Sequence, residues 1–250
     1  MGDCYDKESL WPLRQEIIDC MKGYKGCYQR AYRCLGAAAE ILEDQRSVLL
    51  TDSLSHKLAK RARGILVREI PRRRAERPGQ VKQRFLGAIT HQGPMCLYDT
   101  VLTRCSRVYV LTDPCSLAHE LLIHLLAGVT AAGLDVVACP DPMAPDRLAH
   151  LLIPQAELAF VTSTTALPFP GKPYRRIRLD TAADREVLRC SRPRLRFAKK
   201  VSAALVEEAV LSLSQAKAMH DKLEAVYNPH VDFGLVESIS QDIRSEIMRF

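Results

Sequence analysis

The amino-acid sequence predicts an α/β protein with a mostly parallel sheet flanked by helices and with an N-terminal helical segment. After residue 80, short apolar runs typical of buried strands alternate with helical patterns. Before residue 80, apolar side chains recur at helical spacing only. A chain of 250 residues that is 47% hydrophobic is also long and apolar enough to bury the core that such a sheet needs.

Two helices are expected in the N-terminal part. Apolar residues recur every three or four positions over 13–42, which predicts a long amphipathic helix with Pro12 in its first turn. A second, more basic helical pattern covers 47–70, and two prolines and a glycine in 71–79 end it. We therefore divide the chain into a helical segment, 1–80, and an α/β domain with C-terminal helices, 81–250.

The α/β domain is read from alternating strand and helix patterns. Gly133 suits the left-handed position that ends a helix, and the strands on either side of that helix form a βαβ unit. The expected elements are, in order, a strand at 84–90, a turn at 91–94, a short helix within 95–105, a strand at 107–111, a helix at 116–132, a strand at 134–140, a proline-rich connection, an apolar stretch at 150–154, strands at 158–164 and 175–181, and helices at 197–227 and 232–248.

The net charge of +7 comes from 36 basic and 29 acidic residues and is concentrated in two stretches, 57–84 and 172–200. Basic stretches of this kind bind phosphates or form a solvated face. Because neither stretch interleaves aromatic residues at a stacking distance, nucleic acid is an alternative partner but not the favoured one.

No apolar run approaches the roughly 20 residues that cross a bilayer, and acids occupy the N-terminus where a signal peptide carries positive charge. The nine cysteines have an odd count and no framework spacing, so we expect reduced thiols. These features predict a cytoplasmic chain that does not contact membranes.

The segment Thr112–Glu120, TDPCSLAHE, lies between a strand and a helix, where a mononucleotide phosphate loop is found. A P-loop needs glycines for backbone donors, a lysine for the phosphate charge and a hydroxyl for magnesium. Here Pro114 removes a donor, Asp113 adds negative charge beside the intended phosphate, and His119 stands near the place of the missing lysine. The helix N-terminus, with Ser116 as its expected cap, keeps a weak capacity for anions.

The residues assigned to this degenerate phosphate loop are Thr112, Asp113, Ser116 and His119. The carboxylate that holds magnesium in P-loop proteins should follow an apolar strand, but the strand at 158–164 ends in hydroxyl residues. Asp141 is the nearest carboxylate to a strand end, and its position between two prolines is typical of a turn. We therefore assign no catalytic residue and no metal ligand.

Several stretches resemble a family of bacterial tandem P-loop ATPase-like proteins. FLGAITHQGP (85–94), the βαβ unit, CPDPMAPDRLAHLLIPQAELAFV (139–161) and NPHVDFGLVESI (228–239) resemble the second domain of these proteins. GDCYDKESLW (2–11) and QRAYRCLGAAA (29–39) resemble the segment that closes their first domain. The resemblance implies a P-loop NTPase-like fold over 81–250, a start within the two-domain arrangement, and ATP with Mg²⁺ as the family's cofactor. The phosphate motif itself is missing, so no binding residue is carried over.

Other constellations have simpler structural interpretations. Cys115, His119 and His124 could share a helix face, and Cys139, Asp141 and His150 lie near a strand end, but no metal-binding motif is present. Cys115 at a helix N-terminus is the one thiol whose pKa the helix dipole would lower, yet no orienting residue accompanies it. His91 is expected in a turn.

Three functions remain open. The first is a degenerate ATPase-family protein that keeps the fold for binding, with a protein partner or a second copy reached through the N-terminal helices. The second is an active ATP-dependent enzyme with a non-standard phosphate site around Ser116, His119, Lys172, Arg175 and Arg176. The third is a basic module that docks on nucleic acid or an acidic partner.

Overall fold

The computed structural model describes residues 4–71 and 76–249, so part of the predicted break at 71–79 lies outside the described residues. The helices are α1 (Lys7–Leu10), η1 (Trp11–Leu13), α2 (Arg14–Leu49), α3 (Asp52–Glu69), α4 (Tyr98–Leu102), α5 (Ala118–Ala131), η2 (Pro154–Ala156), η3 (Asp180–Ala182), α6 (Arg185–Tyr227), η4 (Asn228–His230) and α7 (Phe233–Ile247). The strands are β1 (Val81–Gln83), β2 (Gly87–Thr90), β3 (Gly93–Cys96), β4 (Arg107–Thr112), β5 (Val136–Pro140), β6 (Leu148–Ile153), β7 (Leu158–Ser163) and β8 (Arg175–Arg178).

The predicted α/β class is confirmed by a six-stranded sheet in the order β1-β5-β6-β7-β4-β8, while β2 and β3 form a separate hairpin. Within the six-stranded sheet β6 is antiparallel to both of its neighbours, and the other three strand pairs are parallel. The sequence predicted β6 only as an apolar stretch, because a short apolar run does not reveal the direction of its strand. The predicted βαβ unit is β4-α5-β5, with β6 and β7 between its two strands.

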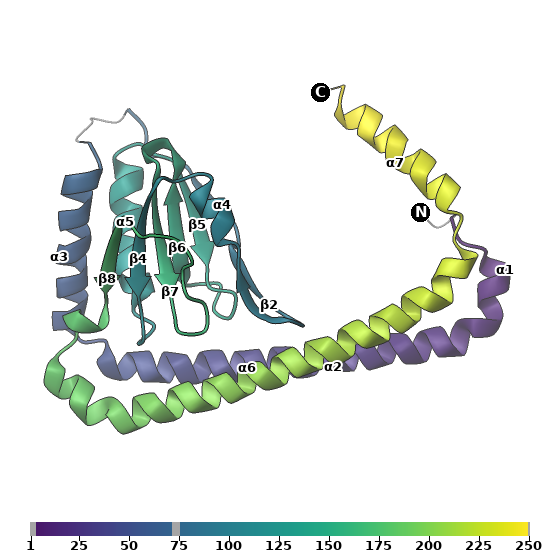
Figure 1. Ribbon diagram of the computed structural model, residues 1–250, viewed down its shortest axis with the longest axis horizontal. Coiled ribbons are helices and arrows are strands. Elements are labelled where there is room, and N and C mark those ends of the chain that lie inside the picture. Colours follow the sequence, from purple (N-terminus) through teal and green to yellow (C-terminus); the bar gives the residue numbers. More distant parts are fainter. Residues whose placement is uncertain (1–3, 72–75, 250) are drawn as a thin grey trace. The chain divides into compact units, whose positions relative to one another are not determined.

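Two apolar cores lie on the two faces of this sheet. On one face, α3 and α5 pack through leucines and isoleucines against Tyr109, Leu111 and Phe160 (Figure 1). The two helices approach closely at Gly128, where a Cβ atom would lie 2.2 Å from a methyl group of Leu66. On the other face, α4 and the chain around Phe169 cover the second core. The sheet is thus buried from both sides, as parallel strands require.

Helix ends follow the local signals. Thr51 caps α3 by accepting from the Leu54 amide, and Asp232 caps α7 by accepting from the Leu235 amide. Gly133 adopts the predicted left-handed conformation, with a φ of 79°, after α5. α6 begins at Arg185 rather than at the expected residue 197 and continues through Pro193, which lies at an exposed position.

The chain divides into two compact units. Residues 1–33 with 209–250 form the first unit, and residues 34–208 form the second. The boundaries of these units differ from the expected boundary at residue 80. α2 and α6 each contribute to both. The second unit includes α3, because Leu54, Leu58, Ala62 and Ile65 are buried in the core of the sheet.

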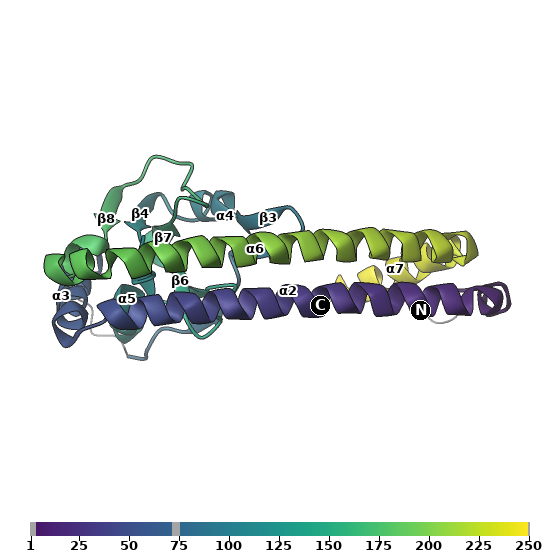
Figure 2. The same cartoon turned by 90° about the horizontal axis from the view of Figure 1, so that it is seen from below.

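In the first unit, residues 14–33 of α2 lie alongside residues 209–227 of α6 (Figure 2). The small side chains Ala31, Ala209 and Ala216 are fully buried there. A Cβ atom on Gly23 would lie 2.6 Å from the sulfur of Met219, which shows how closely the two helices approach. Within the described ranges, no helix is long and apolar enough to cross a membrane.

Candidate functional site

The loop between β4 and α5 is built around the side chain of Asp113. Its carboxylate accepts hydrogen bonds from the backbone N–H groups of Cys115 (3.3 Å), Leu117 (2.9 Å) and Ala118 (2.6 Å). Asp113 is only 7% exposed. Backbone N–H groups at the start of a helix that follows a strand are the groups that hold a phosphate in mononucleotide sites. In this chain a carboxylate of the protein itself occupies them.

The backbone of Ser116 allows this arrangement. Ser116 has a φ of 57°, in the left-handed region that few residues other than glycine adopt. The prediction that Ser116 caps the helix is wrong, because α5 begins two residues later and its amides are already taken by Asp113. Burial raises the pKa of Asp113, and the three N–H bonds oppose that rise.

Two arginines from elsewhere in the chain approach this loop. Nη2 of Arg147 donates to the Ser116 carbonyl at 3.2 Å and lies 3.8 Å from Oε1 of Glu120. Arg46 of α2 is 5% exposed and pairs with Glu43. Burial and the charge of Arg147 both lower the pKa of Arg46.

The loop itself carries no lysine or arginine, but two arginines from other parts of the chain lie beside it. No local pattern could have shown this, because tertiary packing brings both arginines to the loop. Since each has a carboxylate beside it, Glu43 or Glu120, the arginines do not leave an open site for an anion.

His119 does not replace the lysine of a phosphate loop. Its Nδ1 accepts a hydrogen bond from the backbone N–H of Leu148 at 2.9 Å, which fixes the proton of the neutral ring on Nε2. Burial, together with the charge of Arg147, lowers the pKa of His119. The hydroxyl of Thr112, which is the remaining residue assigned to the loop, accepts a hydrogen bond from Nη1 of Arg176 at 3.4 Å. The four assigned residues thus lie in one loop, but each is engaged within the protein.

The neighbouring strand ends do not supply a magnesium carboxylate in the part of the chain that the structure describes. Asp141 accepts from the Met143 amide at 2.8 Å, which confirms its interpretation as a turn residue. Ser163 at the end of β7 accepts from the Phe169 amide at 3.1 Å, and Thr164 accepts from the Leu167 amide. These hydroxyl groups fix their own loop.

Of the cysteine and histidine constellations, Cys115, Cys139 and His150 are buried, whereas His124 is exposed. The prediction of a lowered pKa for Cys115 is wrong, since burial, with the charge of Asp113, raises that pKa to about 11. Burial also raises the pKa of Cys139 to about 12. His150 accepts from the Thr162 amide at 3.1 Å and lies 3.8 Å from the sulfur of Cys96. Among residues 4–71 and 76–249, no group of three or more His, Cys, Asp or Glu could hold a metal ion.

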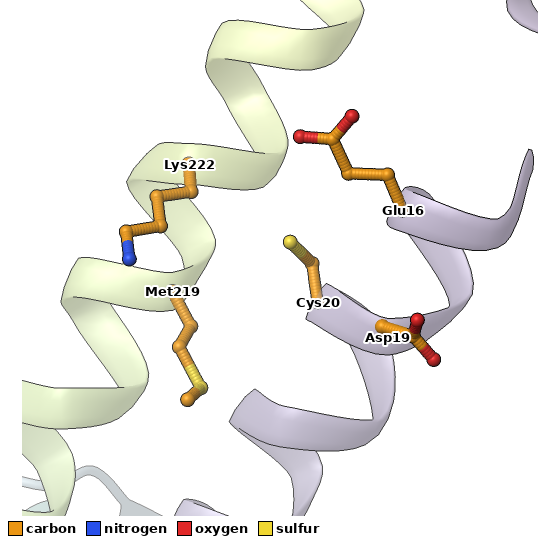
Figure 3. Close-up of a pocket in the computed structure, with 5 residues that line it drawn as sticks. All are labelled: Glu16, Asp19, Cys20, Met219 and Lys222. Carbon is orange, nitrogen blue, oxygen red and sulfur yellow. The ribbon is translucent and has the colours of Figure 1, made fainter. Parts of the chain in front are cut away.

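Two hollows lie away from the loop. One, of about 490 Å³, lies between α2 and α6 in the first unit (Figure 3). It is lined by Glu16, Asp19, Cys20, Met219 and Lys222. The carboxylates and the thiol come from α2, and the thioether and the amine come from α6 (Figure 3). Sequence patterns gave no signal for it.

The other hollow, of about 340 Å³, lies in the second unit between α3 and β8 and is lined by five arginines. Two of them, Arg175 and Arg176, were among the residues considered for a non-standard phosphate site. The remaining three, Arg61, Arg68 and Arg178, are distributed over the two basic stretches of the sequence.

Comparison with family models, with curated proteins and with solved structures finds no match for this chain.

Proposed function

We propose that this chain is a degenerate P-loop ATPase-like protein that acts by binding a partner and does not hold nucleotide at the loop after β4. The observation that supports the proposal is the Asp113 carboxylate, which accepts three backbone N–H bonds at the helix start, where a P-loop protein would hold its phosphate. A phosphate at this place would have to displace a buried carboxylate and then remain beside it. Hydrogen bonds to a charged group contribute about 1.5–3 kcal/mol each, so the displacement is strongly unfavourable.

The sheet supports the ancestral part of the proposal. The strand before the loop, β4, lies between β7 and β8 and parallel to both. Parallel strands place their carboxyl ends at one edge of a sheet, which is where open α/β folds bind ligands. An ATPase-like ancestor would have had its phosphate loop there.

The alternative of an active ATP-dependent enzyme has weaker support. Arg176 reaches Thr112, but the Ser116 carbonyl is held by Arg147 and His119 is held by Leu148. A nucleotide at this edge would need several of these bonds to break before it could bind.

Exposed apolar side chains in the first unit favour a protein partner or a second copy. Trp11 is 72% exposed, and on α7 Phe233 and Ile247 are 60% and 66% exposed. Burial of these exposed side chains against a partner helix or a second copy would remove their apolar surface from water. Sedimentation of the purified chain over a range of concentrations tests for self-association.

The loop is tested by following the backbone amide signals of Leu117 and Ala118 by nuclear magnetic resonance during titration with Mg-ATP, together with an ATP hydrolysis assay. We expect unchanged amide signals and no turnover. Shifts of these two amides by Mg-ATP, or hydrolysis that follows the protein through purification, would contradict the proposal. The control is Asp113→Gly, in which the amides lose their carboxylate and should shift on addition of inorganic phosphate.

A further inference from the structure

The groove between α3 and β8 gathers arginines from two distant stretches of the chain. Arg61, Ile65 and Arg68 line it from α3, Arg175 and Ile177 line it from β8, and Tyr109 of β4 also lines it. Figure 1 shows the two elements next to each other at the edge of the sheet. At about 340 Å³ the groove falls within the range of small-molecule sites.

The strand register explains which arginine of β8 faces α3. Arg175 and Ile177 pair with Tyr109 and Leu111, whose side chains belong to the core under α3. Successive side chains of a strand alternate between its faces, so Arg175 and Ile177 lie on the α3 side. Arg178 lies on the other face and is paired with Asp180.

Carboxylates balance only part of the positive charge of the groove, at Arg68 and Arg178. Nη1 of Arg61 donates to the neutral carbonyl of Arg178 at 3.0 Å, and the guanidinium of Arg175 lies 5.6 Å from the ring centre of Tyr174. In the described ranges neither arginine forms an ion pair. Arg68 lies 3.2 Å from Glu69, but Glu69 is shared with Arg107 at 2.6 Å.

We propose that this groove binds a small anion that carries several phosphate groups. The planar guanidinium group presents paired donors that match phosphate oxygens. Arg61 of α3 and Arg175 of β8 provide two such groups on opposite walls, and Arg68, whose Nε and Nη2 donate to Glu69 and Tyr109, adds its charge. An acidic peptide that adds to the edge of the sheet fits less well, because Arg61 already occupies the Arg178 carbonyl on β8. No residue of the Asp113 loop lines this groove, so the inference goes beyond the proposed function and does not depend on it.

The test is calorimetric titration of the full chain with sodium tripolyphosphate at a fixed ionic strength. The groove variant is Arg61→Gln with Arg175→Gln. The matched control is Arg192→Gln with Arg196→Gln. It removes the same charge at two exposed arginines of α6 elsewhere in the second unit. We expect the groove variant to bind tripolyphosphate at least tenfold more weakly than the unmodified chain, and the control to stay within about twofold.

Equal weakening in both double variants would show a general charge effect and would overturn the proposal. Binding of poly-glutamate as tightly as tripolyphosphate would also overturn it, because the site would then recognise charge and not phosphate. Binding of a 20-nucleotide DNA strand without any binding of tripolyphosphate would overturn it in favour of a nucleic-acid surface.

Titration with ATP in the absence of magnesium identifies the source of the phosphates. Tighter binding of ATP than of tripolyphosphate supports a nucleoside polyphosphate as the ligand, and equal binding supports a free oligophosphate. In either case the NMR signals of the Leu117 and Ala118 amides should stay unchanged. Loss of anion binding at the groove can therefore be distinguished from nucleotide binding at the Asp113 loop.

Discussion

The Asp113 carboxylate lies 2.6 Å from the backbone nitrogen of Ala118, the first residue of α5. The start of a helix carries unpaired N–H groups and a partial positive charge, which attract an anion. In this chain the anion is covalently attached, so the helix end is satisfied without any ligand. The Asp113 side chain therefore satisfies the helix start in the way that a bound anion would.

Removal of this carboxylate should destabilise the protein and create a site for a small anion. Asp113→Gly should lower the free energy of unfolding by about 2 kcal/mol, because three N–H groups at the helix start lose their acceptor. Sodium acetate, which has the shape of the missing side chain, should raise the melting temperature of the variant more than sodium chloride does at equal ionic strength. The unmodified chain should show only the general difference between the two salts, and an identical response of variant and unmodified chain would contradict the role of Asp113.

Local sequence signals predicted most elements of the sheet but not what surrounds its loop. The predicted positions of four elements were close to the observed ones: β4, α5, β5 and β7. Apolar runs between turns indicate the strands, and Gly133 indicates the end of α5, and both are local features of the sequence. The absence of a lysine and of glycines in the loop was also evident. The sequence did not show that Asp113 accepts from the helix amides. That role depends on the left-handed backbone of Ser116, and a residue other than glycine gives little sign of that conformation.

The groove shows a second limit of sequence reasoning. Arg61 and Arg68 belong to the first basic stretch and Arg175 to the second, and each stretch by itself is typical of a solvated face. Only the pairing of β8 with β4, and the packing of α3 on the same face, brings the three side chains together. Long-range strand order of this kind is not encoded in any short window of residues.

Glu69 is expected to stabilise the region where α3 meets the sheet. Its side chain is 2% exposed and accepts from the Tyr109 hydroxyl at 2.5 Å and from Arg107 at 2.6 Å. Burial alone would raise the pKa of Glu69, but hydrogen bonds from Tyr109 and Arg68 and the charge of Arg107 lower it. Glu69→Gln should therefore lower the free energy of unfolding by about 2 kcal/mol at pH 7. This is less than the roughly 3–5 kcal/mol lost when a fully buried ion pair is broken, because solvent screens the partly exposed arginines.

Urea denaturation measures this loss, with Glu186→Gln as the control in an exposed ion pair that should change stability by less than about 1 kcal/mol. Because a lowered carboxyl pKa stabilises the fold only above that pKa, the difference between Glu69→Gln and the unmodified chain should shrink as the pH falls below the ordinary value of 4.5. A difference that stays constant down to pH 3 would show that the charge of Glu69 does not contribute.

Gln45 offers a stabilising substitution. Within the described ranges its Oε1 atom is buried without a hydrogen-bond partner, and the residue is 3% exposed. An unsatisfied buried acceptor costs about 1–3 kcal/mol, and methionine has a similar length without this acceptor. Gln45→Met should raise the free energy of unfolding by about 1 kcal/mol in urea denaturation. Gln15→Met, at an exposed position of α2, is the control, and a loss of stability in Gln45→Met would show that the amide is satisfied in solution.

His150 should make the stability of the second unit sensitive to acid. Its Nδ1 accepts from the Thr162 amide, so the ring is neutral, and burial lowers its pKa from 6.5 to about 4. A group with a lowered basic pKa stabilises the fold above the unfolded value, and this stability is lost as the pH falls from 6.5 towards 4. The loss should reach about 3 kcal/mol, since each pKa unit corresponds to about 1.4 kcal/mol.

The variant His150→Asn isolates this contribution, because the Asn carbonyl can still accept from Thr162 but does not titrate. At pH 8 the variant should be less stable than the unmodified chain, and by pH 4 most of that difference should have disappeared. Urea denaturation at half-unit pH steps measures both curves, and His56→Asn, at an exposed position of α3, should leave the profile unchanged. If His150→Asn loses stability with acid as steeply as the unmodified chain, the acid sensitivity arises from other groups, of which His119 is the next to test because burial lowers its pKa as well.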